Sequence, residues 1–472
     1  MNTPINRLHQ TTRRHFFSEC GIGIGKMALV SLCAEGAFAA QGTAPRVPHH
    51  KPRAKHVIHL FMAGAPSQLE LFDYKPGLIK IEGQPLPPSL LENQRYAFIR
   101  KDAAVMAPQF RFAKHGKCGT EISDALPYLS KIVDDITLVR SVKTDQFNHA
   151  PAQLFFNTGS GLPGRPSMGS WLTYGLGSEN KNLPGFMVFS TGAGISGGAA
   201  NWSSGFLPTT HSGVRLRNQG EPMLNLSRPS DISSGEDQAT AAALRAMNAQ
   251  RQRKELDPAI DARISSYELA YRMQTEAPDV MDLSNEYKET LEMYGADPKV
   301  PSFARACLLA RRMVERGVRF INIYHEGWDA HSDVVGNITG NARATDKASA
   351  ALVTDLKQRG LLDDTIVIWG GEFGRTPMVE SNKALGRSQG RDHHPAAYSM
   401  WFAGGGFKQG FTFGETDDLG FNVVKDPVHV HDIQATILHC LGIDHTRLTY
   451  RFAGRDYRLT DVHGQVVASI LT

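Results

Sequence analysis

Cysteine is scarce in this chain, with five in 472 residues. Two of them fall within the first 39 residues, and the other three are Cys118, Cys307 and Cys440. An odd number of widely spaced cysteines gives neither a disulfide framework nor a CxxC metal site, and it allows one bridge at most. A core of this size needs no such crosslink.

An excess of charge of one sign is also missing. The chain carries 51 Lys and Arg against 47 Asp and Glu, a formal net charge of +4 at pH 7. Residues 1–39 hold four of these cations and two of the acids, so their removal leaves +2. A nearly neutral chain offers no electrostatic basis for binding nucleic acid. With 41% hydrophobic and 21% charged residues, the composition is typical of a globular protein.

Long apolar runs are lacking near the N-terminus. The stretch from Ile22 to Leu32 is short and contains Lys26, so it is not predicted to be a stable membrane span. It follows Thr12-Arg13-Arg14-His15-Phe16-Phe17, which resembles the twin-arginine export motif, and precedes Ala37-Phe38-Ala39, which has the form of a signal peptidase site. We therefore expect residues 1–39 to be a signal peptide.

Such a signal predicts export through the twin-arginine machinery and a periplasmic or secreted protein. Two alternatives stay open at this point. The segment is also compatible with a mobile basic tail, and Cys33 with a lipid anchor, although Leu32 stands where a small residue is expected before a lipidated cysteine. We expect the mature chain to begin near Ala40, with a flexible lead-in over residues 40–54.

Residues 55–472 alternate between strand and helix patterns, which predicts an α/β domain. Apolar β-branched runs predict strands at 56–62, 136–142, 317–324, 365–369 and 398–403. Helical spacing predicts helices at 126–133, 149–159, 302–316, 344–359 and 429–441. Ala, Arg, Glu, Met and Leu dominate around 235–315, which we interpret as a mainly helical insertion. Gly, Ser, Pro and Asn are frequent over 160–220, which predicts loops and short strands.

Carboxylates and imidazoles stand at the ends of the predicted strands. The most informative stretch is 363–377, where a β-branched strand ends in glycines and delivers Glu372 to the sheet edge at which open α/β proteins bind ligands. Three further clusters are 148–151, 325–333 and 392–395. Mixed carboxylates and imidazoles suit zinc or a related divalent cation, whereas oxygens alone suit calcium or magnesium. Each cluster alone has a structural alternative, but the four together predict an ion.

Three segments resemble the alkaline phosphatase/sulfatase-like superfamily. Residues 356–368, followed by Gly371-Glu372-Phe373-Gly374, are similar to a sulfatase helix and strand that end in S-D-H-G. Residues 431–443 are similar to the superfamily's D-I-x-x-T-x-L helix, and residues 149–159 have the spacing of the sulfatase nucleophile helix. The resemblance implies an α/β fold with a mixed, mostly parallel sheet sandwiched by helices. It also implies metal-dependent hydrolysis of sulfate or phosphate esters.

The chain resembles more closely a family of twin-arginine-exported bacterial proteins of unknown function that share this core. The resemblance covers almost all of the mature chain. The shared motifs are Ala63-Gly64-Ala65-Pro66-Ser67, residues 164–171, residues 372–377 and residues 390–395.

The sequence departs from the superfamily pattern at the metal centres. The first strand ends without the usual acid, for which Glu70 or Asp73 is a candidate substitute, and Glu372-Phe373 replaces an Asp-His pair. We therefore expect one divalent ion at most, zinc, manganese or calcium. The predicted ligands are Asp329, His331, Glu372, His393 and His394.

His149 stands at the nucleophile position but has no hydroxyl oxygen. It is a candidate nucleophile through nitrogen, general acid or base, or metal ligand, and the alternative is a hydrogen bond in an inactive site. Asn148 is a candidate for orienting a substrate oxygen. Arg375, Arg391 and Arg165 are candidate sulfate or phosphate ligands, because a guanidinium fork suits these anions. For Arg375 and Arg391 a salt bridge to a nearby acid is the alternative.

Two functions follow from these patterns. The first is an exported metal-dependent hydrolase of sulfate or phosphate esters, with small esters and sulfated or phosphorylated glycans as candidate substrates. The second is a non-catalytic exported binding protein that keeps the sulfatase-like fold but lacks the first-strand acid and the hydroxyl nucleophile.

Overall fold

The computed structural model describes residues 45–91, 98–100, 102–192, 194–218, 231, 233–255, 258–382 and 386–472. The predicted signal peptide, residues 1–39, lies outside the described residues, as does the lead-in up to residue 44. The rest of the lead-in is held by backbone hydrogen bonds, among them His50 N to Gly442 O and Arg53 N to Cys440 O. Within the described part of the chain, no helix has the length and apolar character of a membrane span.

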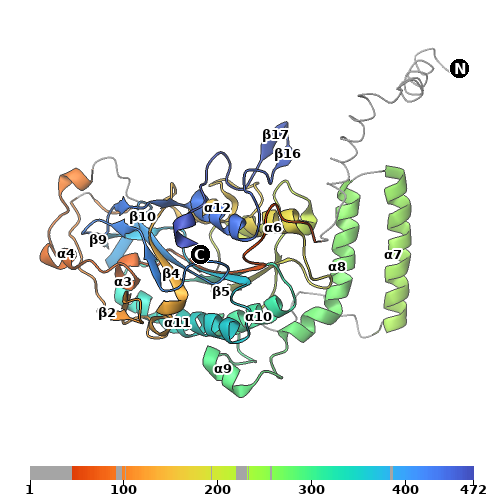
Figure 1. The fold of residues 1–472 in the computed structure, drawn as a ribbon, viewed down its shortest axis with the longest axis horizontal. Coiled ribbons are helices and arrows are strands. Elements are labelled where there is room, and N and C mark those ends of the chain that lie inside the picture. The colour runs from red at the N-terminus through yellow and green to blue at the C-terminus, as the bar shows by residue number, and fades with distance from the viewer. Residues whose placement is uncertain are drawn as a thin grey trace, which may run out of the picture.

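A mixed nine-stranded sheet forms the centre of the protein (Figure 1). Its strands run in the order β12 (Phe411–Phe413), β4 (Ile136–Lys143), β11 (Tyr398–Ala403), β8 (Thr365–Gly370), β1 (His56–Ala63), β7 (Phe320–Glu326), β5 (Phe186–Thr191) and β6 (Val214–Arg215), with β15 (Val428–His429) also beside β4. Among these strands, β11 pairs antiparallel with both neighbours, and the other pairs are parallel. The predicted α/β class with a mostly parallel sheet is confirmed.

Helices cover both faces of the sheet because its central strands are apolar on both sides. Strand β1 is buried throughout. Its alternate side chains Ile58, Leu60 and Met62 belong to one core and Val57, Phe61 and Ala63 to the other. The first core is completed by α10 (Phe303–Glu315) and α11 (Val334–Gln358), and the second by α5 (His149–Thr158), α6 (Met168–Leu176) and α12 (Val430–Cys440). Figure 1 shows α10 and α11 on one side of the sheet and α6 and α12 on the other.

The strands predicted at 317–324 and 365–369 and the helix predicted at 344–359 form the strand–helix–strand unit β7–α11–β8, and β1 lies between its two parallel strands. Helix α11 begins at Val334, ten residues before the predicted start at 344. Asp333 caps it by accepting a hydrogen bond from Gly336 N. The first turns of this helix mix Val334, Val335 and Ile338 with Gly, Asn and Thr, which are weak helix formers, so its helical pattern is clear only further along.

Four helices lie in the described part of the region around 235–315. They are α7 (Ser234–Glu255), α8 (Pro258–Met281), α9 (Lys288–Tyr294) and α10. Ser302 caps α10, because its hydroxyl accepts a hydrogen bond from Arg305 N. Helices α7 and α8 lie side by side at one edge of the molecule (Figure 1). Helix α10 instead packs in the main core beside α11.

Several short elements surround the sheet. The predicted helix at 126–133 is wrong: the segment forms two 3-10 turns, Leu129–Lys131 and Val133–Asp135. The Gly-rich region 160–220 contains a helix, α6, that the sequence analysis missed. The other elements are α3 (Gln68–Leu71), α4 (Pro76–Lys80), β2 (Phe112–His115), β3 (Thr120–Ser123), β9 (Gly374–Asn382), β10 (Arg387–His394), β13 (Glu415–Thr416), β14 (Val423–Lys425), β16 (Tyr450–Phe452) and β17 (Arg455–Tyr457).

Candidate metal centre

The candidate site lies where the strands of the sheet end. His149 opens α5 after β4, Asp329 and His331 follow β7, and Glu372 follows β8. The fourth element is β10, which forms an antiparallel hairpin with β9 and carries His393. The carboxyl ends of β1, β7 and β8 meet at the same edge because these strands are parallel and adjacent. Residues distant in sequence are thereby gathered at one place.

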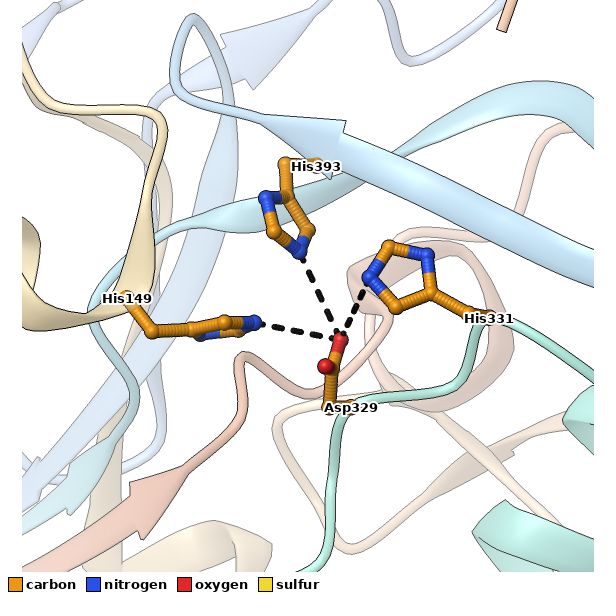
Figure 2. Close-up of side chains that lie close together, drawn as sticks. All are labelled: His149, Asp329, His331 and His393. Atoms are coloured by element: carbon orange, nitrogen blue, oxygen red, sulfur yellow. Dashed lines mark ion pairs between the residues drawn. The ribbon is translucent and has the colours of Figure 1, made fainter. Parts of the chain in front are cut away.

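Three histidines surround one carboxylate oxygen of Asp329 (Figure 2). The distances from Asp329 Oδ1 to the Nε2 atoms are 3.1 Å for His149, 3.0 Å for His331 and 3.4 Å for His393. Their candidate ligand atoms all lie within 4.8 Å of one another. Three imidazole nitrogens from three parts of the chain therefore converge on one carboxylate oxygen.

Each histidine is fixed from behind through its other ring nitrogen. His149 Nδ1 lies 2.6 Å from Glu372 Oε1, and His331 Nδ1 contacts Glu380 Oε2. His393 Nδ1 lies 2.8 Å from the carbonyl oxygen of Phe147. Carboxylates and carbonyls accept hydrogen bonds, so each Nδ1 donates and each Nε2 is turned to the centre. Histidine ligands of metals are held in this way in most metalloproteins.

Glu372 is fully buried and supports the centre rather than facing it. Besides His149, its Oε1 accepts from Gly64 N and Gln153 Nε2, both at 3.0 Å. Gly64 is also required by close packing. Its φ is +105°, and a Cβ there would lie 2.5 Å from the backbone nitrogen of Asp329. The glycine loop after β1 thus lets two site segments approach each other.

Arg375 holds Asp329 from the other side. Its Nη2 lies 2.6 Å from Asp329 Oδ1, and its remaining donors reach the backbone carbonyls of Gly64, Ala65 and Arg391. The arginine side chain is fully buried, whereas that of Asp329 is 41% exposed. The centre is therefore rigid on its protein side and open to solvent at the carboxylate.

The electrostatics of the cluster follow from this crowding. Burial opposes a charge on His149, but the carboxylates of Asp329 and Glu372 outweigh it and raise its pKa to about 9. Burial also disfavours the Asp329 anion, yet the three histidines and Arg375 hold its pKa well below the usual range. For His393, burial dominates and lowers the pKa to about 3. A divalent ion bound among these groups would compete with protons for the same nitrogens.

The donor set fits a divalent transition-metal ion. The Nε2 atoms of His149 and His393 are buried and, within the described residues, have no hydrogen-bond partner of adequate geometry. Three imidazole nitrogens and one carboxylate oxygen suit zinc and its neighbours, whereas calcium and magnesium take oxygen ligands. Of the five predicted ligands, Asp329, His331 and His393 lie in the cluster, and His149, predicted as a catalytic residue, joins them.

The remaining predicted residues lie elsewhere. His394 points to the opposite side of β10, where its Nε2 contacts the carbonyl of Phe421. Successive side chains of a strand face opposite ways, so His393 and His394 cannot share one ion. Asn148 is the residue before α5, and its side chain does not cap the helix. Asp73, a candidate for the missing first-strand acid, instead contacts Thr416 and Lys75.

The other two predicted arginines are engaged in ion pairs. Arg391 is fully buried and lies 2.7 Å from Glu70, the other candidate acid. Arg165 lies 3.1 Å from Asp461 and stacks over the ring of Tyr457. Their predicted role in anion binding stays a prediction.

Glu380 shows what the sequence analysis missed. The β9–β10 hairpin was not predicted, and Glu380 lies on it, fully buried behind His331. In Pro377-Met378-Val379-Glu380 two apolar residues are adjacent, so the segment lacks the period-two alternation that would have indicated a strand. A second acidic group, His331, Glu380 and Asp392, lies behind the cluster. Its Asp392 accepts from the backbone nitrogens of Phe98, Ile99 and His393, so it orders the hairpin and its neighbour.

Fold and site together define an α/β protein with a candidate mononuclear His3Asp metal centre at the ends of its parallel strands. More particularly, residues 54–471 match the model of a family described as protein of unknown function (DUF1501), so the chain belongs to that family. The predicted membership of a family of unknown function is confirmed. No curated protein matches the chain.

Solved structures show only distant similarity. Ps i-CgsB in complex with k-i-k-neocarrahexaose has a TM-score of 0.36 and 11% identity, over 82% of this chain and 72% of that one. Lipoteichoic acid synthase LtaP from Listeria monocytogenes has a TM-score of 0.32 and 9% identity, over 90% and 80%. Alkaline phosphatase from the Antarctic bacterium TAB5 has a TM-score of 0.30 and 12% identity, over 84% and 99%. Similarity at this level carries no weight for activity or substrate.

Proposed function

We propose that this protein binds one divalent transition-metal ion, with zinc as the first candidate, and hydrolyses a sulfate or phosphate ester. The ligands are His149, Asp329, His331 and His393. The observation that carries the proposal is the convergence of three histidine Nε2 atoms on Asp329 Oδ1, with all three Nδ1 atoms hydrogen-bonded behind. Only Nε2 of each ring is then available to a ligand at the centre.

The opening at Asp329 supports a catalytic rather than a purely structural ion. Structural zinc sites are closed by four protein ligands, whereas catalytic sites usually have three and bind water or substrate in the fourth position. With four protein ligands here, water would need a fifth coordination position on the exposed side of Asp329. Here the carboxylate is 41% exposed, while the histidine side chains are 3% to 17% exposed. A divalent ion in such a site polarises an ester oxygen and promotes the ionisation of water. The chain's own part is to hold the donors and to exclude water from three sides.

His149 takes the place that a hydroxyl nucleophile has in the superfamily. Its Nδ1 is occupied by Glu372 and its Nε2 faces Asp329, so neither nitrogen is directed to solvent. We therefore assign His149 to the ligand set rather than to nucleophilic attack. In that assignment water, rather than a side chain of the cluster, is the nucleophile of the proposed reaction.

A non-catalytic metal-binding protein is the second candidate. It is favoured because the three arginines predicted to bind anions are already engaged: Arg375 and Arg391 are fully buried, and Arg165 is paired with Asp461. A hydrolase would have to recognise the sulfate or phosphate through other groups. Both candidates bind the ion, and only the first hydrolyses an ester.

A pair of adjacent histidines gives a matched test. His393 and His394 are 3% and 2% exposed, so His393→Ala and His394→Ala should cost similar stability. Metal content by mass spectrometry should be close to one zinc per chain in the wild type and His394→Ala, and near zero in His393→Ala. Zinc-loaded protein is then assayed on aryl sulfates, aryl phosphates, phosphodiesters and sulfated glycans. Turnover lost in His393→Ala supports the hydrolase, whereas bound metal without turnover on any ester supports the binding protein.

Export to the periplasm or beyond is a separate proposal. It is supported by Arg13-Arg14 and the apolar segment that follows, all outside the described residues. Fusing residues 1–45 to a reporter that is active only after export tests it. Export should depend on the twin-arginine machinery and fail in the double variant R13K/R14K.

A further inference from the structure

Glu380 is a buried acid with no role in the proposed chemistry. It lies on β9 with a fully buried side chain and divides its two oxygens between two partners. Oε2 accepts from His331 Nδ1, and Oε1 lies 2.6 Å from Arg387 Nη1. A buried carboxylate is costly unless each oxygen is paired, and here both are.

The surroundings of His331 leave it one orientation. The rings of Phe98 and His331 are perpendicular with centroids 4.9 Å apart, and the Arg387 guanidinium lies 4.3 Å over the Phe98 ring. From the backbone side, a Cβ on Gly390 would lie 2.1 Å from the carbonyl carbon of His331. The β9–β10 hairpin therefore encloses this histidine, and Glu380 supplies its polar contact.

We propose that Glu380 is a positioning residue that sets the affinity of the centre for a divalent ion by fixing the orientation of His331 and the place of its Nδ1 proton. The inference rests on the proposed metal site. Glu380 Oε2 is hydrogen-bonded to the far side of the ring, so Glu380 acts through His331 and not as a ligand. Arg387 balances the charge of Glu380, which lets the carboxylate accept from the imidazole at little cost.

The three hydrogen bonds behind the histidines are not equivalent. His393 is held by a backbone carbonyl, which no side-chain substitution removes, and His149 by Glu372, which also binds Gly64 and Gln153. Glu380 alone among the three acceptors contacts one histidine and one partly exposed arginine. Its removal therefore affects the support of one ligand only, together with the ion pair to Arg387.

The experiment compares Glu380→Ala, Glu380→Gln and a distant control, Glu415→Ala. Glu415 is exposed and paired with Lys425, away from the centre. Zinc affinity is measured on the full chain by competition with a chromophoric chelator. Loss of a hydrogen bond to a metal-bound histidine weakens affinity by roughly 10–100-fold. We expect that loss in Glu380→Ala, a smaller one in Glu380→Gln, whose amide oxygen still accepts from Nδ1, and none in Glu415→Ala.

A second measurement does not need the metal. Proton spectra of metal-free protein labelled with ¹⁵N-histidine should show a slowly exchanging His331 Nδ1 proton in the wild type, lost in Glu380→Ala. Unchanged zinc affinity with the Nδ1 proton retained would overturn the inference, as would a loss of thermal stability alone. If the wild type binds no zinc, the proposed function fails, while the Nδ1 proton still decides whether Glu380 fixes the ring.

Discussion

His59 makes the stability of this protein sensitive to acid. It lies in β1, is fully buried, and packs on Phe61 and Phe156 with ring centroids 5.2 and 5.1 Å away. Within the described residues neither of its nitrogens has a hydrogen-bond partner. Burial among these rings lowers its pKa to about 3 from an ordinary value of 6.5. The ring therefore stays neutral in the folded state down to low pH.

The sign of the effect follows from proton linkage. Above pH 6.5 the histidine is neutral in both states and contributes no pH dependence. As the pH falls below 6.5, His59 binds a proton in the unfolded chain but stays neutral in the folded protein, so the free energy of unfolding decreases. Each pH unit costs about 1.4 kcal/mol, which gives about 2 kcal/mol between pH 6.5 and 5. The whole shift amounts to on the order of 5 kcal/mol by about pH 3.

The test compares the wild type with His59→Phe and His59→Gln. Neither replacement titrates, so both should lose about 2 kcal/mol less than the wild type between pH 6.5 and 5. Phe and Gln differ in packing and polarity, so they shift stability at pH 7 by different amounts. Equilibrium urea unfolding at each pH gives the free energies. Equal acid losses in all three proteins would refute the reasoning.

Three further predictions concern the site. Glu372→Gln places an amide where the carboxylate accepts from His149. It should therefore lower the free energy of unfolding in urea by about 2 kcal/mol and weaken zinc binding about tenfold. Unchanged zinc affinity would argue against that contact. Gly64→Ala should displace Asp329 and reduce bound zinc in elemental analysis, at least tenfold, while circular dichroism stays native. Asp333→Ala should remove the α11 cap at a cost of about 1 kcal/mol yet retain zinc, in contrast to Asp329→Ala; metal loss in both would contradict the assignment.

The fold could be largely predicted from the sequence, because its central strands are continuous apolar runs and its helices have clear caps. Ser302 and Gly159 mark the ends of α10 and α5 as expected. The short hairpin β9–β10 could not be predicted with equal ease, since its polar residues are buried by pairing with distant groups. Glu380 is an example: its burial depends on His331 and Arg387, and no local pattern records that.

The candidate site was predictable in its residue types but not in its arrangement. Asp329, His331 and His393 could be predicted as ligands because they stand beside the ends of predicted strands. Whether Glu372 faced the centre or stood behind His149 depends on how β8 and α5 pack, which spacing does not determine. The choice between His393 and His394 depends on the register of β10, where a shift of one residue exchanges the two faces.

The order in which the cluster residues occur along the chain has a consequence for folding. His149 comes early, Asp329 and His331 late, and His393 later still, on a hairpin that closes over the others. No short fragment holds the four donors, so an ion cannot nucleate the fold as it does in small zinc-dependent domains. An ion that binds tightly would instead bind only the folded domain and stabilise it by mass action. The fraction of chains that hold the ion would therefore equal the fraction in which the whole domain is folded.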